Sequence, residues 1–236
     1  MRVLITRPRA DAEALAALLG ERDIGALIEP MLEIIPKPVP ALELDDVQAL
    51  LLTSANGARA LALATDRRDL ALFAVGPATA MAARDAGFAD VATADGDVAA
   101  LSHLVESRLK PADGALLHVS GSAVAGDLAG RLGRAGFETR RAVLYEARAL
   151  SALSEDAVAA LIQGEIHAVL LFSPRTAKSF VRLCHLASLT LDGVRALCLS
   201  PAVAHQAEAT RWFEIAVAAR PDQDALLALI QTPPGD

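Results

Sequence analysis

The chain has 236 residues, of which 53% are hydrophobic and 3% aromatic, and its formal net charge is −7. This acidic balance and the shortage of aromatic rings argue against a nucleic-acid-binding protein, which needs a basic surface. Apolar runs such as 168–172 are far shorter than the ~20 residues of a membrane-spanning helix. The length allows one large domain or two of about 110 to 120 residues, and we expect two.

The amino terminus and the cysteines indicate the compartment and the chemistry. The segment from Met1 to Pro8 reaches a turn signal after Val3, Leu4 and Ile5. So short a run is too little for the core of a signal peptide, and we expect a cytoplasmic protein. Cys184 and Cys198 have no second pair and the histidines are scattered, so we expect buried thiols and no metal.

Short apolar runs alternate with segments of helical period along the chain. This alternation is typical of a parallel sheet covered by helices on both faces, so we predict an α/β protein built of three-layer units. Trp212 and Phe213 begin what we predict to be a late strand, with both rings in the core. The other predicted strands are 2–6, 50–53, 72–75, 115–119, 168–172 and 194–199.

The predicted helices follow these strands. They are rich in alanine and leucine, which have high helix propensity, and start signals precede them. They cover 11–19, 79–86, 123–132, 176–184 and 202–210.

The chain also repeats itself. A shift of 113 positions places Leu15 and Leu19 on Leu128 and Leu132, inside similar strand-helix segments. Further matches pair 51–54 with 170–173 and 75–80 with 199–204. Chance similarity between strand-turn-helix segments is the alternative, but the shared order of elements favours two copies of one α/β unit.

Two extended connectors separate these segments. In 34–40, three prolines forbid a helix and favour a semi-rigid extended chain. The stretch 141–147 is apolar and extended, and would carry the chain back. A two-stranded hinge is therefore plausible.

Six strand-to-helix junctions carry hydroxyls, small residues and proline: 6–8, 53–56, 76–79, 120–122, 173–176 and 200–201. Ordinary helix capping would explain most of them. The functional alternative is anion binding, because helix amino termini present free amides along one edge of a parallel sheet.

Cationic side chains lie at or just beyond these turns and could make a binding cleft locally basic. Each of them could equally be an ordinary solvated side chain at the surface. For Tyr145, the one tyrosine, packing and catalysis stay equally open. The spacing of Gly121 and Gly126 suggests a phosphate loop, but Asp127 and Leu128 stand where lysine and a hydroxyl residue are required. The cationic residues are Arg7, Arg9, Arg59, Arg175 and Lys178.

Five segments in this order and spacing resemble the uroporphyrinogen-III synthase family: 3–8, 52–57, 75–80, 143–146 and 172–174. The resemblance covers nearly the whole chain. It implies two flavodoxin-like or Rossmann-like domains joined by a two-stranded β-ladder formed by connectors at about 34–40 and 141–148. Residues 1–35 plus 148–236 would form one domain and 38–145 the other, with the active site in the cleft between the domains.

The resemblance also implies a carbon–oxygen lyase of haem biosynthesis that closes hydroxymethylbilane, a linear tetrapyrrole with eight carboxylates, to uroporphyrinogen III. It implies no cofactor, and we expect a monomer. Tyr145 matches the family's tyrosine near the leaving hydroxyl. Ser200 and Val203 depart from the family's glycine and threonine, which puts binding through that turn in doubt. The expected substrate-binding residues are Thr6, Arg7, Thr53, Ser54, Asn56, Gly76, Ser120, Gly121, Ser173 and Arg175.

Two other classes compete with this interpretation. One is a noncatalytic tetrapyrrole-binding or regulatory module of the same fold. The other is a glycosyltransferase-like two-domain enzyme, for which the sequence offers no acidic metal motif and no nucleotide signature.

Overall fold

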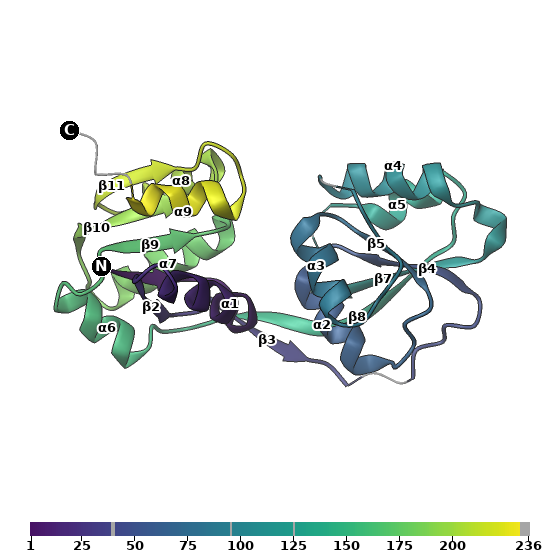
Figure 1. Cartoon of the computed structure of the whole chain (residues 1–236), viewed down its shortest axis with the longest axis horizontal. Helices are drawn as coiled ribbons and strands as arrows, with labels where there is room; N and C mark the ends of the chain where they lie inside the picture. The colour runs from purple at the N-terminus through teal and green to yellow at the C-terminus, as the bar shows by residue number, and fades with distance from the viewer. Residues whose placement is uncertain (39–40, 95, 125, 232–236) are drawn as a thin grey trace. The chain divides into compact units, whose positions relative to one another are not determined.

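The computed structural model describes residues 1–38, 41–94, 96–124 and 126–231. The chain divides into two compact units (Figure 1). Unit 1 combines Met1–Glu33 with Arg148–Asp236, and unit 2 is Ile34–Ala147. That each unit folds as an independent domain stays a prediction.

Unit 1 is a parallel sheet with the strand order β11-β10-β9-β1-β2. Helices cover both of its faces: Leu4 and Val169 pack toward α6, α7 and α8, whereas Val3 and Leu170 pack toward α1 and α9. The strands are β1 (Arg2–Ile5), β2 (Gly25–Ile28), β9 (Ala168–Leu171), β10 (Leu191–Cys198) and β11 (Trp212–Val217). The helices are α1 (Arg9–Gly20), α6 (Glu155–Ile162), α7 (Pro174–Leu186), α8 (Pro201–Ala207) and α9 (Gln223–Gln231).

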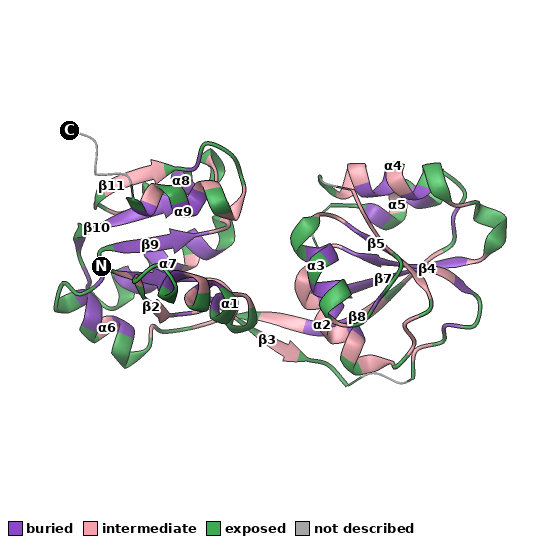
Figure 2. Ribbon diagram, in the orientation of Figure 1, coloured by how far each residue is buried: buried purple, intermediate pink, exposed green. Residues whose placement is uncertain are grey.

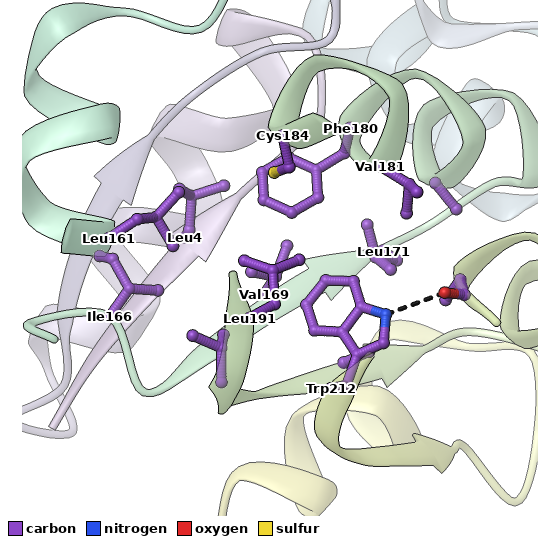
Figure 3. Packing of buried hydrophobic residues seen from close by; sticks show 14 of the residues in the cluster. Leu4, Leu161, Ile166, Val169, Leu171, Phe180, Val181, Cys184, Leu191 and Trp212 are labelled. Atoms are coloured by element: carbon purple, nitrogen blue, oxygen red, sulfur yellow. Dashed lines mark hydrogen bonds between the residues drawn. The ribbon is translucent and has the colours of Figure 1, made fainter. Parts of the chain in front are cut away.

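The larger core of unit 1 lies under α7 (Figure 3). Phe180 stacks on Trp212 with 6.0 Å between ring centroids, and the indole Nε1 of Trp212 donates to the carbonyl of Ala207 at 2.9 Å. The expectation that both rings of the late strand are buried is wrong for Phe213, which is 58% exposed. Successive side chains of a strand point to opposite faces, so Phe213 points away from the face that holds Trp212.

Unit 2 has the strand order β3-β8-β7-β4-β5-β6. Leu50 and Leu52 pack toward α2 and α3, whereas Ala49 and Leu51 pack toward α4 and α5. Figure 2 shows the central strands of both sheets buried. The strands are β3 (Leu32–Pro36), β4 (Val47–Leu52), β5 (Ala71–Ala74), β6 (Val91–Thr93), β7 (Ala115–Gly121) and β8 (Thr139–Ala149). The helices are α2 (Ala55–Ala64), α3 (Pro77–Asp85), α4 (Val98–Arg108), the 3-10 turn Pro111–Asp113 and α5 (Leu128–Arg134).

The predicted fold class is confirmed, and the two sheets reflect the sequence repeat. Without β3, the order β8-β7-β4-β5-β6 corresponds strand by strand to β2-β1-β9-β10-β11. The sequence matches pair β1 with β7, β9 with β4 and β10 with β5, which hold equivalent positions in the two sheets.

The two extended connectors pair as β3 and β8. The amide of Lys37 donates to the carbonyl of Leu144 at 2.8 Å, and the amide of Leu150 donates to the carbonyl of Met31 at 3.2 Å. Since residue numbers rise along one strand as they fall along the other, the pairing is antiparallel. The expected connector also included residues 39–40, which lie outside the described residues.

Two predicted helices are shorter than expected. The helix placed at 123–132 begins only at Leu128, because Gly126 has a φ of 76° and Asp127 caps the helix by accepting from the amide of Gly130. Residue 125 lies outside the described residues. The helix placed at 202–210 ends at Ala207, where the chain turns toward β11.

Candidate active site

In unit 2, a pocket of about 310 Å³ lies at the carboxyl ends of β4, β5 and β7. These strands are parallel neighbours in the order β7-β4-β5, so their carboxyl ends share one edge of the sheet, where ligands of open α/β sheets bind. The lining residues are Thr53, Ser54, Val75, Asp97, Val98, Gly121, Ala123, Val124 and Tyr145.

Tyr145 and Ser54 form a hydroxyl pair in this pocket. Their oxygens lie 2.7 Å apart, and Tyr145 is only 8% exposed. Ser54 is the N-cap of α2, and its Oγ accepts from the amide of Gly57 at 3.1 Å. The serine is therefore held by the start of the helix, and the phenol is held by the serine.

Gly121 forms the surface on which the ring of Tyr145 lies. The two residues are aligned partners in the β7–β8 pairing, and the amide of Ser122 donates to the carbonyl of Tyr145 at 2.9 Å. A β-carbon at position 121 would meet Cε2 of the ring at 2.7 Å. Only glycine admits the ring in this position.

Arg141 holds the end of β7 from the neighbouring strand β8. Its Nε donates to Oγ of Ser120 at 2.8 Å, and its Nη2 donates to the carbonyls of Gly121 and Ser122 at 2.7 and 2.9 Å. One planar guanidinium thus fixes the turn on which the tyrosine ring rests. Ser120 is itself buried, and its hydroxyl is engaged by this contact.

His118, next to the pocket residue Thr53, is buried and neutral. Its Nε2 lies 3.4 Å from Oγ1 of Thr53. Burial, and secondly the positive charge of Arg141, lowers the pKa of His118 from 6.5 to about 4. The imidazole is thus uncharged at neutral pH and can orient the threonine hydroxyl.

The remaining expected residues of unit 2 lie at helix starts. Oδ1 of Asn56 accepts from Arg59 at 3.0 Å. Gly76 is the N-cap of α3 and provides no side-chain cap. Asp97, which sequence reasoning missed, caps α4 by accepting from the amides of Ala99 and Ala100, and these bonds lower its pKa.

In unit 1, the expected binding residues follow β1 and β9, which are neighbours in the sheet. Thr6 is fully buried and donates to the carbonyl of Leu170 at 2.7 Å. The guanidinium of Arg7 lies 4.6 Å over the ring of Phe172 and donates to Gln223 at 3.1 Å. Ser173 forms a capping box with Thr176 at the start of α7, where Arg175 is exposed.

Val203 stands where the family is expected to have a threonine. Its side chain is 1% exposed and belongs to the core of unit 1, which suits an apolar residue. Ser200 is the N-cap of α8 but makes no side-chain capping bond.

Sequence reasoning found the hydroxyl-bearing turns but missed several pocket and supporting residues. An N-cap signal before the apolar pattern of 98–108 could have indicated Asp97. Nothing local marks His118 or Arg141, because the contact of His118 with Thr53 depends on the pairing of β7 with β4, and the contacts of Arg141 depend on the pairing of β7 with β8. The other missed lining residues are Val75, Val98, Ala123 and Val124.

Neither a metal cluster nor a membrane helix occurs in the described part of the chain. Among residues 1–38, 41–94, 96–124 and 126–231, no group of three or more histidine, cysteine or acidic side chains could hold a metal ion. Within the same ranges, every helix is too short or too polar to cross a bilayer. Cys184 and Cys198 are buried, which raises the pKa of both thiols to about 12.

Two α/β units built on mainly parallel sheets, one with a hydroxyl pair at the carboxyl ends of its strands, place the protein in the α/β class, in which ligands generally sit at strand ends. The family model described as uroporphyrinogen-III synthase HemD matches residues 13–228. The chain therefore belongs to the uroporphyrinogen-III synthase HemD family, and it is an enzyme of tetrapyrrole and haem biosynthesis with a small-molecule substrate.

Solved structures share this fold. The uroporphyrinogen-III synthetase of Helicobacter pylori 26695 aligns over 98% of both chains with 18% identity and a TM-score of 0.65. A mutant uroporphyrinogen III synthase from the extremely thermophilic bacterium Thermus thermophilus aligns over 98% of this chain and 97% of its own, with 20% identity and a TM-score of 0.54. No curated protein sequence matches the chain.

Proposed function

We propose that the protein is a carbon–oxygen lyase that converts hydroxymethylbilane to uroporphyrinogen III. The substrate loses its hydroxyl as water, and the ring closes with inversion of ring D. The hydrogen-bonded pair of Tyr145 and Ser54 carries the proposal, because it offers a phenolic proton donor inside a strand-end pocket. Family membership supports the substrate, and the noncatalytic alternative is not favoured.

Tyr145 is the proposed catalytic residue. As the carbon–oxygen bond breaks, the lone pair of the adjoining pyrrole nitrogen moves into the ring and forms a double bond to the methylene carbon. The departing oxygen takes the proton of the Tyr145 phenol and leaves as water. Attack of the substituted carbon of ring D on this methylene gives a spiro intermediate. The older bond from that carbon, to the methylene of ring C, then breaks, and the lone pair of the ring C nitrogen forms a double bond to the released methylene. This methylene bonds to the free α-carbon of ring D, which closes the macrocycle, and the proton that this carbon loses restores the phenol.

The pocket holds part of the substrate. Small-molecule sites have volumes of about 300 to 1,000 Å³, so a pocket of about 310 Å³ suits one substituted ring and not a whole tetrapyrrole. We propose that the ring carrying the hydroxymethyl group enters it. This arrangement would leave the other rings and their carboxylates outside the pocket.

We propose that backbone amides and hydroxyls at the strand-end turns of each unit bind these carboxylates. The reaction would need no metal and no cofactor, because the chain supplies a proton donor and positions the reacting carbons. We also propose a monomer that acts in the cytoplasm without nucleic acid. The binding residues are Thr53, Ser54, Asn56, Gly76, Ser120 and Gly121 in unit 2 and Thr6, Arg7, Ser173 and Arg175 in unit 1.

The test supplies enzymatically generated hydroxymethylbilane to the purified protein, oxidises the product and separates the type I and type III porphyrin isomers. By family resemblance, the unaided substrate cyclises to the type I isomer. Dominant type III product that scales with protein concentration supports the proposal. Type I product at the unassisted rate contradicts it.

A further inference from the structure

The bond between Ser54 and Tyr145 can be arranged in two ways, since either hydroxyl can be the donor. A serine hydroxyl has one proton and two lone pairs. One lone pair of Ser54 already accepts from the amide of Gly57. The direction of the second bond therefore decides where the phenol's proton points.

If Tyr145 donated to Ser54, the serine proton would need another acceptor. Among the described residues, the recorded partners of Ser54 Oγ are the amide of Gly57, which can only donate, and the phenol of Tyr145. If Ser54 donates to Tyr145, its proton is used and the phenol's proton is free to enter the pocket. Each arrangement contains two hydrogen bonds and leaves one proton over, the serine's in the first and the phenol's in the second. Only in the second arrangement can the phenol donate to a substrate in the pocket, as the proposed acid catalysis requires.

We propose that Ser54 is a positioning residue that donates to the phenolic oxygen of Tyr145 and thereby turns the phenol's proton toward the leaving hydroxyl. This inference rests on the proposed function and changes the expected role of Ser54, which acts through the tyrosine and not on a substrate carboxylate. The chain of donors runs from the amide of Gly57 to Ser54, then to Tyr145, and from Tyr145 to the departing oxygen.

This order of donors assists the reaction at the moment of proton transfer. As the phenol gives up its proton, negative charge grows on its oxygen. The Ser54 hydroxyl already points at that oxygen, so the contact strengthens without reorganisation. The helix start behind Ser54 adds the positive end of the α2 dipole.

A double-mutant cycle tests the inference with Ser54→Ala, Tyr145→Phe and both changes together. Turnover, KM and the type III to type I ratio are measured with enzymatically generated hydroxymethylbilane. We expect Ser54→Ala alone to lower kcat about fivefold to tenfold, the worth of one hydrogen bond, with little change in KM. In the Tyr145→Phe background, the same change should lower kcat by less than about twofold.

Two further variants separate positioning from folding. Ser54→Thr keeps a hydroxyl that can cap α2 and donate to Tyr145, so it should recover most of the lost kcat. Ser154→Ala is the matched control, because Ser154 caps α6 by accepting from the amide of Ala157 and belongs to unit 1, whereas the residues that line the pocket belong to unit 2. It should lower thermal stability and leave kcat unchanged.

An equal loss of kcat from Ser54→Ala in both backgrounds would overturn the inference, because the serine would then act independently of Tyr145. A change confined to KM would overturn it as well. Both results differ from failure of the proposed function, in which the wild-type protein forms no type III isomer at all.

Discussion

The ring of Tyr145 lies directly against the backbone of Gly121, so closely that a β-carbon there would be 2.7 Å from Cε2 and 2.9 Å from Cζ. Real carbon atoms do not approach so closely, and the aromatic ring would have to move. The position of the phenol thus depends on the absence of a side chain one strand away.

We expect Gly121→Ala to lower kcat by at least as much as Tyr145→Phe, because the displaced ring loses its bond to Ser54. Overpacking of this kind costs about 1 to 3 kcal/mol of unfolding free energy. Gly133→Ala is the matched control, since a β-carbon there meets nothing within 4 Å and α5 should gain about 0.5 to 1 kcal/mol. Isomer assays and urea unfolding measure both effects, and full activity in Gly121→Ala would contradict the geometry.

Arg141→Lys should lower both stability and turnover. An ammonium group cannot reproduce the guanidinium fork that holds Ser120 and the carbonyls of Gly121 and Ser122. We expect a loss of about 1.5 to 3 kcal/mol of unfolding free energy, the range for hydrogen bonds to a charged group, and a lower kcat. Arg140→Lys is the control on the same strand, because its ion pairs with Asp46 and Glu138 lie at the surface and contribute little to stability. Equal effects of the two changes would count against the role of Arg141.

His118 should destabilise the protein in mild acid. The pKa of its imidazole is about 4 in the folded chain and about 6.5 when unfolded, so the unfolded state takes up the proton first as the pH falls. Stability from this group is present above pH 6.5 and is lost between pH 6.5 and 4, by roughly 3 kcal/mol. His118→Gln removes this dependence. Urea unfolding at pH 7 and pH 4.5 should show a smaller loss for the variant than for the wild type, and identical losses would refute the assignment.

Exhaustive chelation and dialysis should leave type III formation unchanged, because the proposed steps use only side chains and backbone amides. The measurement compares isomer ratio and rate before and after treatment. Loss of activity that one specific metal ion restores would refute the cofactor-free mechanism.

Residues 34–147 expressed alone should fold, because this unit is continuous in sequence and both faces of its sheet have helices. Dispersed amide resonances in an NMR spectrum would support this prediction. A disordered spectrum, together with a folded 1–112 fragment, would favour a sequential arrangement of domains.

The elements that sequence reasoning found are those with strong local patterns. The apolar runs of β4 and β9 are bounded by hydroxyl turns, so both strand and turn are visible in the sequence. By contrast, β2 and β6 were not predicted. β2 has four residues and begins with Gly25, and β6 has three, so neither strand is long enough to show a periodic pattern. The late start of α5 was missed because Gly126 interrupts an alanine-rich run that otherwise has helical composition.

The site residues divide in the same way, into those that a local sequence pattern marks and those that it does not. Ser54 was found because a capping hydroxyl follows an apolar run, and Tyr145 because its segment resembles a known family. The supporting contacts of Arg141 join β8 to the end of β7, and their geometry depends on strand register, which no local pattern encodes.

The discontinuous sequence of unit 1 imposes an order on biosynthesis. Strand β1 leaves the ribosome well before one of its two partners, β9, which begins at Ala168. At about 5 to 20 residues per second, the nascent chain exposes one edge of β1 for roughly 8 to 30 s before β9 emerges, while all of unit 2 has time to fold. Val3, Leu4 and Ile5, fully buried in the finished protein, are therefore a predicted binding site for a chaperone during translation.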